Sequence, residues 1–218
     1  MTKVIKSFDE YKEVYQRSVE DPEGFWAEQA ETFTWQKKWD KVVEWDFHNL
    51  DVKWFVNGKM NITENCLDRH LADRGDQTAI LWEANDPKAP NKTYTYRQLY
   101  EAVNRTANAL KANGIQKGDR VCFYMPMVPE LAIAVLACAR IGAVHSVVFA
   151  GFSASALADR IKDSECKMVI CSDFNDRGAK HIPVKAVVDE AIALGCDSVK
   201  TVLVHQSTGD PLEIGRAH

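Results

Sequence analysis

The chain has 218 residues, of which 46% are hydrophobic and 27% are charged, and its formal net charge is −4. This composition is typical of a globular protein and excludes the disordered, collagen-like and membrane-spanning classes. Because proteins that hold a nucleic-acid backbone carry a surplus of cations, we expect no nucleic-acid partner.

The N-terminus has no apolar core of a secretory signal, and the longest apolar stretch, residues 131–139, is too short to cross a bilayer. The sequence therefore predicts a cytoplasmic protein with no membrane partner. Six cysteines occur without a CxxC pair or any ligand-like clustering. We expect free thiols, and neither disulfides nor a metal site.

Residues 1–60 form the first predicted region. Ser7 followed by two acids, and Asp21 followed by Pro22, are both typical of helix starts. Several tryptophans then crowd a stretch with little periodicity, at positions 26, 35, 39, 45 and 54. We interpret this region as a helical, Trp-rich arm that anchors itself on a larger body through aromatic side chains. A dedicated ligand surface is the alternative.

The second region, residues 61–211, alternates predicted helices and strands. Helices are expected from Thr63, from Thr95 with Gln98 as a capping box, and from Pro129, Ser153 and Pro183. The expected strands are short apolar runs, at 78–82, 121–124, 144–149, 167–171 and 199–204. This order predicts an α/β fold with a parallel-rich sheet covered by helices on both faces. His145 lies in one of these runs and is predicted to be a core histidine.

Two strand-to-helix junctions are candidate sites, because ligands of such sheets bind at the carboxyl ends of strands. The first junction is residues 149–153, Phe-Ala-Gly-Phe-Ser. Its small residues permit close approach to the backbone, and the next helix offers free N–H groups. The simpler alternative is that Gly151 makes a tight turn and Ser153 only caps a helix.

The second junction is residues 173–180, which place Arg177 and Lys180 around one glycine-containing turn. Arginine can make a forked contact with phosphate and lysine adds a point charge. The alternative is a solvated loop whose cations balance its own Asp173 and Asp176. His181 beside Lys180 could assist anion binding. No Walker, GxGxxG, HExxH or GxSxG motif is present, so spacing alone leaves the function open.

Longer stretches resemble the acetyl-CoA synthetases of the adenylate-forming superfamily. Residues 143–153 (AVHSVVFAGFS) with 156–161 (ALADRI) are similar to a hallmark of that family, and residues 124–142 are similar to the segment before it. Further matches occur at 25–29, 61–70 and 93–99. The resemblance covers nearly the whole chain up to about Pro211.

The resemblance implies a large N-terminal domain, of which this chain is the first, incomplete portion, and a small mobile C-terminal domain. It implies an enzyme that makes acetyl-CoA from acetate, Mg-ATP and CoA through an acetyl-adenylate. Phe149, Ala150 and Gly151 would line the channel for the pantetheine arm of CoA. Arg177 and Lys180 would hold its nucleotide end, although Ala150 replaces a common glycine and Ala179-Lys180 replaces a common Gly-Arg.

The resemblance also implies what the chain lacks. A phosphate loop like TSGSTGxPKG does not occur in it, so we expect no catalytic residue in the chain, the ATP and Mg sites outside it, and a chain inactive alone. Residues 212–218 depart from the family pattern and are interpreted as a possible frame or expression scar. Two alternatives stay open: a synthetase for propionate or another short-chain acid, and a stand-alone CoA-binding or interaction module. The oligomeric state is open.

Overall fold

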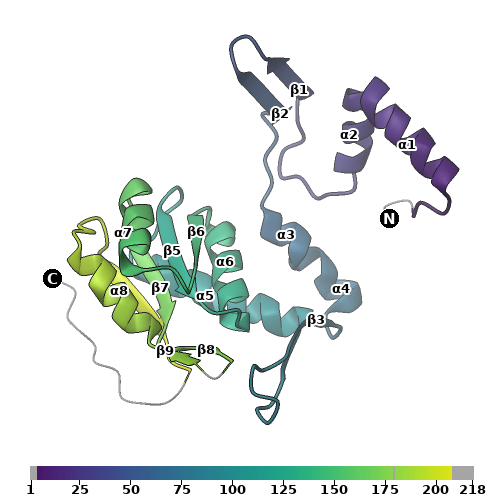
Figure 1. Cartoon of the computed structure of the whole chain (residues 1–218). Coiled ribbons are helices and arrows are strands. Elements are labelled where there is room, and N and C mark those ends of the chain that lie inside the picture. Colours follow the sequence, from purple (N-terminus) through teal and green to yellow (C-terminus); the bar gives the residue numbers. More distant parts are fainter. Residues whose placement is uncertain (1–3, 179, 208–218) are drawn as a thin grey trace. The chain divides into compact units, whose positions relative to one another are not determined.

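The computed structural model describes residues 4–178 and 180–207, and the chain divides into two compact units at the boundary between Cys66 and Leu67 (Figure 1). The possible scar at 212–218 and Ala179 of the cation turn lie outside the described residues. No helix of the described part is long and apolar enough to cross a membrane.

The first unit begins with two helices, α1 (Phe8–Glu20) and α2 (Pro22–Ala30), at the predicted positions. The Ser7 side chain accepts a hydrogen bond from the Glu10 N–H, and Asp21 accepts one from the Gly24 N–H. These side chains satisfy backbone donors that the first helical turn leaves unpaired. The local cap signals in the sequence therefore located both helix starts.

A β-hairpin that the sequence analysis did not predict follows these helices in the first unit. Its strands are β1 (Lys41–Asp46) and β2 (Asp51–Val56), which pair antiparallel. Trp35, Trp39 and Phe55 pack together, with ring centroids 5.0–5.3 Å apart. Several of the tryptophans thus form a local aromatic cluster within this unit.

The predicted helix from Thr63 to Gly75 is divided into α3 (Ile62–Cys66), the 3₁₀ helix η1 (Asp68–His70) and α4 (Leu71–Arg74). The expected cap at Thr63 is wrong. Asn61 Oδ1 accepts hydrogen bonds from the Thr63 N–H at 3.0 Å and from the Thr63 hydroxyl at 2.7 Å. Asn61 therefore fills the capping role, and Thr63 lies buried as the second residue of α3.

The second unit is the α/β fold that the sequence predicted. Its further elements are β3 (Thr78–Trp82), β4 (Lys92–Thr95), α5 (Tyr96–Ala112), β5 (Arg120–Met125), α6 (Pro129–Ile141), β6 (Val144–Phe149), α7 (Ala154–Asp163), β7 (Met168–Ser172), β8 (Asn175–Arg177), β9 (Lys180–Ile182), α8 (Val184–Ala193) and β10 (Thr201–His205). The Thr95–Gln98 capping box at the start of α5 is confirmed, with both reciprocal hydrogen bonds present.

A four-stranded parallel sheet in the order β10-β7-β5-β6 forms the centre of this unit. Helices α5 and α6 cover one face, and α7 and α8 cover the other (Figure 1). Along β5 the side chains alternate between two cores: Phe123 faces α5 and α6, whereas Cys122 and Tyr124 face α7 and α8. This period-two pattern is what a strand buried on both faces requires.

The prediction that His145 lies in the core is wrong, because this side chain is exposed. Its strand β6 pairs with β5 alone among the described residues and lies at the edge of the sheet. Val144, Val147 and Phe149 of the same strand are also more than half exposed. An apolar run therefore identified the strand correctly but not its position in the sheet.

Candidate functional site

The two junctions selected from the sequence lie at the same edge of the sheet. Strands β6 and β7 both run parallel to β5, one on each side of it, so their carboxyl ends point the same way. Residues 149–153 follow β6, and the hairpin β8–β9 follows β7. Topology therefore brings together two segments about thirty positions apart, at the edge where such sheets bind ligands.

The first junction is a tight turn closed by its own aromatic side chain. The Gly151 N–H donates to the Phe149 carbonyl oxygen at 2.7 Å. A Cβ atom at Gly151 would lie 2.5 Å from the Phe149 ring, which is too close for any other residue without movement. Phe149 is 56% exposed, whereas Ala150 is buried. The glycine thus allows the Phe149 ring to lie over the turn while remaining open to solvent.

Strand β5 and helix α7 hold this turn in place. The Tyr124 hydroxyl donates to the Phe152 carbonyl oxygen at 2.7 Å, and burial raises the pKa of that tyrosine. Ser153 caps α7 as expected, accepting from the Ala156 N–H at 3.3 Å. The backbone from Phe149 to Ser153 is therefore fixed by side chains on both sides of it.

The second junction is a short antiparallel hairpin that pairs the two predicted cations. Arg177 ends β8, Lys180 begins β9, and the two are register partners. Between them, Gly178 adopts φ +59°, a left-handed conformation that glycine reaches without steric cost. Arg177 and Lys180 are both exposed and project from neighbouring positions of one turn.

Two contacts connect the junctions to each other. Asn175 Nδ2 donates to the Ala150 carbonyl oxygen at 3.2 Å, and the Arg177 guanidinium lies 5.6 Å from the centroid of the Phe149 ring. The second contact is a cation–π arrangement. All five residues selected from the sequence, Phe149, Ala150, Gly151, Arg177 and Lys180, thus belong to one continuous arrangement.

The acids of the second junction are engaged elsewhere. Asp173 is buried and accepts hydrogen bonds from the Phe174 N–H and from the N–H and hydroxyl of Ser207. Asp176 Oδ1 lies 2.5 Å from His181 Nδ1, and the His181 ring stacks on Phe174. Neither acid forms an ion pair with Arg177 or Lys180 in the described part of the chain. The described contacts therefore do not support the alternative of a loop whose cations are balanced by Asp173 and Asp176.

Sequence reasoning missed three residues that complete this arrangement. Asn175 ties the hairpin to Ala150, while Phe152 packs edge-on against Phe149 with centroids 5.9 Å apart. Arg160 lies over Phe152, with its guanidinium 4.6 Å from the ring centroid. No spacing rule links Arg160 to a residue eight positions earlier. The sequence feature that could have indicated Arg160 is its position about two turns into a helix that begins at a candidate site.

The arrangement combines two exposed cations with an exposed aromatic ring. Exposed guanidinium and ammonium groups supply forked and point-charge contacts to phosphate, and exposed Phe149 supplies a surface for an aromatic ring or an alkyl chain. The titratable contact described at this hairpin is the His181–Asp176 pair, which lies beside the two cations and is not paired with either of them. In the described residues, no three His, Cys, Asp or Glu side chains are grouped so as to hold a metal ion.

Family comparison assigns the class of protein. Residues 67–215 match the model of the AMP-binding enzymes, and the chain belongs to that family. Residues 11–66 match the model described as the acetyl-coenzyme A synthetase N-terminus. The change from one model to the next coincides with the boundary between the two structural units.

Curated relatives narrow the likeness within that class. The chain is 55% identical over 204 residues to an acetyl-coenzyme A synthetase of Halorhodospira halophila, covering 93% of this chain and 31% of the relative. It is 54% identical over 201 residues to acetyl-coenzyme A synthetase 2 of Pseudomonas putida, with coverages of 92% and 31%. The chain thus spans about a third of the length of these relatives. The resemblance seen in the sequence is confirmed.

A solved structure supports the same fold. The acetoacetyl-CoA synthetase from Streptomyces lividans superposes with a TM-score of 0.81 at 24% identity, over 90% of this chain and 30% of that one. At that identity the likeness concerns the fold alone.

Proposed function

We propose that this chain forms the first part of an AMP-forming acetyl-CoA synthetase and contributes part of its CoA site. The observation that carries the proposal is the pairing of Arg177 and Lys180 beside Phe149, with both local acids engaged elsewhere. Identity above 50% to curated acetyl-CoA synthetases supports the choice of reaction.

In the proposed reaction, a carboxylate oxygen of acetate attacks the α-phosphorus of Mg-ATP and releases pyrophosphate. The CoA thiol then attacks the carbonyl carbon of the acetyl-adenylate and releases AMP. Binding the nucleotide end of CoA directs the thiol toward that carbonyl, so this chain would contribute positioning and not proton transfer. ATP, magnesium and acetate would be bound by residues that this sequence does not contain.

Each predicted residue takes a role that its surroundings allow. Arg177 and Lys180 would bind phosphate groups of CoA, while Phe149 and the turn at Ala150–Gly151 would border the pantetheine arm. Because the Ala150 carbonyl already accepts from Asn175, we propose that this turn is preformed before the ligand arrives. The exposed apolar side chains of β6 fit a sheet that gains further cover in a longer protein.

We also propose a cytoplasmic location. All six cysteines are free, and burial raises the pKa of Cys138 and Cys171 to about 12. Neutral thiols held in a core are compatible with a reducing compartment.

The proposal is tested by titrating the purified chain with CoA in a calorimeter. Wild type is expected to bind, and the double variant Arg177→Gln/Lys180→Gln is expected to bind about a hundredfold more weakly, since each substitution removes a charge-assisted contact. Lys88→Gln serves as the control. Lys88 lies in the turn between β3 and β4, almost ninety positions before the hairpin, and its loss should leave CoA binding unchanged.

Two results would contradict the proposal. Equal CoA binding by wild type and the double variant would remove the assigned site. Acetate-dependent exchange of pyrophosphate into ATP by the purified chain would show that the adenylation machinery does not lie outside it.

A further inference from the structure

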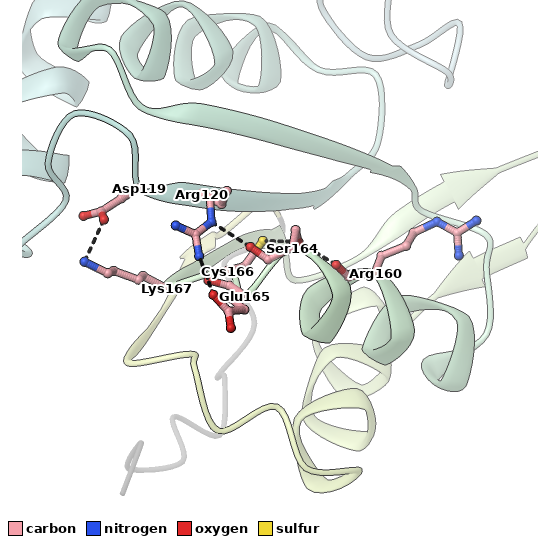
Figure 2. A network of polar contacts seen from close by, with 7 residues as sticks. All are labelled: Asp119, Arg120, Arg160, Ser164, Glu165, Cys166 and Lys167. Carbon is pink, nitrogen blue, oxygen red and sulfur yellow. Dashed lines mark hydrogen bonds and ion pairs between the residues drawn. The ribbon is translucent and has the colours of Figure 1, made fainter. Parts of the chain in front are cut away.

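Helix α7 carries an exposed cation, Arg160, whose side chain is directed to the carboxyl edge of the sheet. Its Nη1 donates to the Ala156 carbonyl oxygen at 2.7 Å, one turn back toward the start of the helix. Figure 2 shows the side chain extending away from Ser164, although the Arg160 backbone oxygen accepts from that serine. The Arg160 backbone therefore bonds to the C-terminal end of α7, whereas its side chain is directed toward the N-terminal end.

The Arg160 guanidinium joins the candidate site through aromatic contacts. It lies 4.6 Å from the Phe152 centroid, Phe152 meets Phe149 edge-on at 5.9 Å, and Arg177 lies 5.6 Å from the Phe149 centroid. Two guanidinium groups thus rest on two adjoining rings that belong to one turn. Such ring contacts fix where a guanidinium lies and leave its edge open to a ligand.

The charge of Arg160 is not balanced within the described residues. No carboxylate there forms an ion pair with it, whereas Arg120 and Arg140 each pair with an acid. A guanidinium offers several N–H groups in a planar fork, and one of those of Arg160 donates to the described chain. An apolar side chain would be enough to cover the Phe152 ring. Arg160 therefore has more N–H donors than its contacts with Phe152 and Ala156 require.

We propose that Arg160 is a third phosphate-binding cation of the CoA site, acting beside Arg177 and Lys180 on the nucleotide portion of the ligand. This inference rests on the proposed function. CoA carries a diphosphate bridge and a separate 3′-phosphate, so it offers more than one anionic group and can engage more than two cations. Arg160 lies against Phe152, whereas Arg177 lies against Phe149, so Arg160 extends the cationic surface from the hairpin toward α7.

The experiment compares Arg160→Gln with Lys162→Gln in the full chain, by calorimetric titration with CoA and with dephospho-CoA. Both variants remove one positive charge from α7, but Lys162 Nζ donates to the Leu194 carbonyl oxygen and not toward the aromatic pair. Arg160→Gln is expected to weaken CoA binding about tenfold, the effect of one charge-assisted contact. Lys162→Gln is expected to match wild type.

The two ligands identify the phosphate involved. Weaker binding of CoA with unchanged binding of dephospho-CoA assigns Arg160 to the 3′-phosphate, and weaker binding of both assigns it to the diphosphate. Arg160→Lys keeps the charge and is expected to recover most of the affinity. Circular dichroism confirms that each variant is folded, and if Arg160→Gln does not fold, Arg160→Met, which keeps the length of the side chain over Phe152 without its charge, takes its place.

Failure of this inference is distinguishable from failure of the proposed function. Wild type that binds CoA while Arg160→Gln binds equally well overturns the role of Arg160 and leaves the site intact. Arg160→Lys as weak as Arg160→Gln would mean that the residue acts by packing, which also overturns the inference. Wild type that binds neither ligand removes the CoA site itself.

Discussion

The connection between α7 and β7, at the amino edge of the parallel sheet, and the hairpin β8–β9, at its carboxyl edge, both carry clustered charges, but they use them in opposite ways. At the amino edge, Arg120 donates to the Ser164 carbonyl at 2.7 Å and to the carbonyl and carboxylate of Glu165 at 3.1 Å (Figure 2). Lys167 Nζ lies 2.6 Å from Asp119 Oδ1. Each of these cations has an acid partner, and together they join the start of β5 to the connection between α7 and β7.

In the hairpin β8–β9 at the carboxyl edge, the acids are turned away from the cations. Asp173 binds Ser207 and Asp176 binds His181, which leaves Arg177 and Lys180 on the exposed turn without an acid partner in the described chain. Like charges at neighbouring exposed positions repel one another, so these two cations add no ion pair to the described part of the fold. The comparison teaches that a candidate site is marked by charge that the fold does not use, and not by the number of charged residues.

The largest effect on stability is expected at the amino edge, from Arg120→Met. The variant removes hydrogen bonds from a charged donor to two carbonyl groups, so we expect a loss of about 2 kcal/mol in the free energy of unfolding. The loss includes support for Glu165, a non-glycine residue held at φ +47°. Urea denaturation measures it, and CoA affinity is expected to stay within about twofold of wild type.

Glu165→Gln is the matched control for that variant. It keeps both backbone contacts of Arg120 and removes only an ion pair whose Glu165 side chain is 78% exposed, so it should cost less than about 1 kcal/mol. A fall in CoA affinity in Arg120→Met without loss of stability would break the distinction between the two edges.

A smaller effect on the free energy of unfolding is expected from the titration of Asp119. Its pKa is lowered from 3.8, first by the hydrogen bond from Lys167 and then by the Gln116 N–H. A lowered folded pKa means that this stabilisation is complete above 3.8 and is lost as pH falls through the folded pKa. Because Lys167 is half exposed, the contribution is at most about 1 kcal/mol.

Asp119→Asn tests this directly, since it keeps an acceptor for the Gln116 N–H but cannot titrate. The difference in unfolding free energy between wild type and the variant should be greatest near pH 6 and should shrink below the ordinary pKa of 3.8. A difference that is constant with pH would mean that Asp119 acts through packing.

Local sequence signals predicted much of the second unit, because they act within a few residues. The Thr95–Gln98 box began α5 as expected, and Pro129 began α6. Strands β8 and β9 could not be recognised, since three residues each are too few to show a period. His145 was misplaced because an apolar run is the same for a central and an edge strand.

The residues of the candidate site could be selected from the sequence, but the contacts of the charged residues around them could not. Arg177 and Lys180 were selected by charge and position, whereas the fate of Asp173 depends on Ser207, which lies 34 positions further along the chain. The contact of Arg160 with Phe152 depends on how α7 leaves its turn. Such long-range pairings decide which charges are free, and no spacing rule contains them.

The smallest expected effect is on CoA affinity, from a variant that adds hydrogen-bond donors to the hairpin at the carboxyl edge and removes no contact. The resemblance to the acetyl-CoA synthetases implies that Lys180 replaces a common arginine, and its ammonium keeps the charge but not the planar fork. Lys180→Arg should tighten CoA binding about two- to threefold through a second donor to the same phosphate, with unfolding free energy unchanged. The gain should disappear in the Arg177→Gln background if the two residues hold one phosphate between them. If instead the gain persists there, the two cations act on separate phosphates, and the hairpin is a row of independent contacts along the ligand.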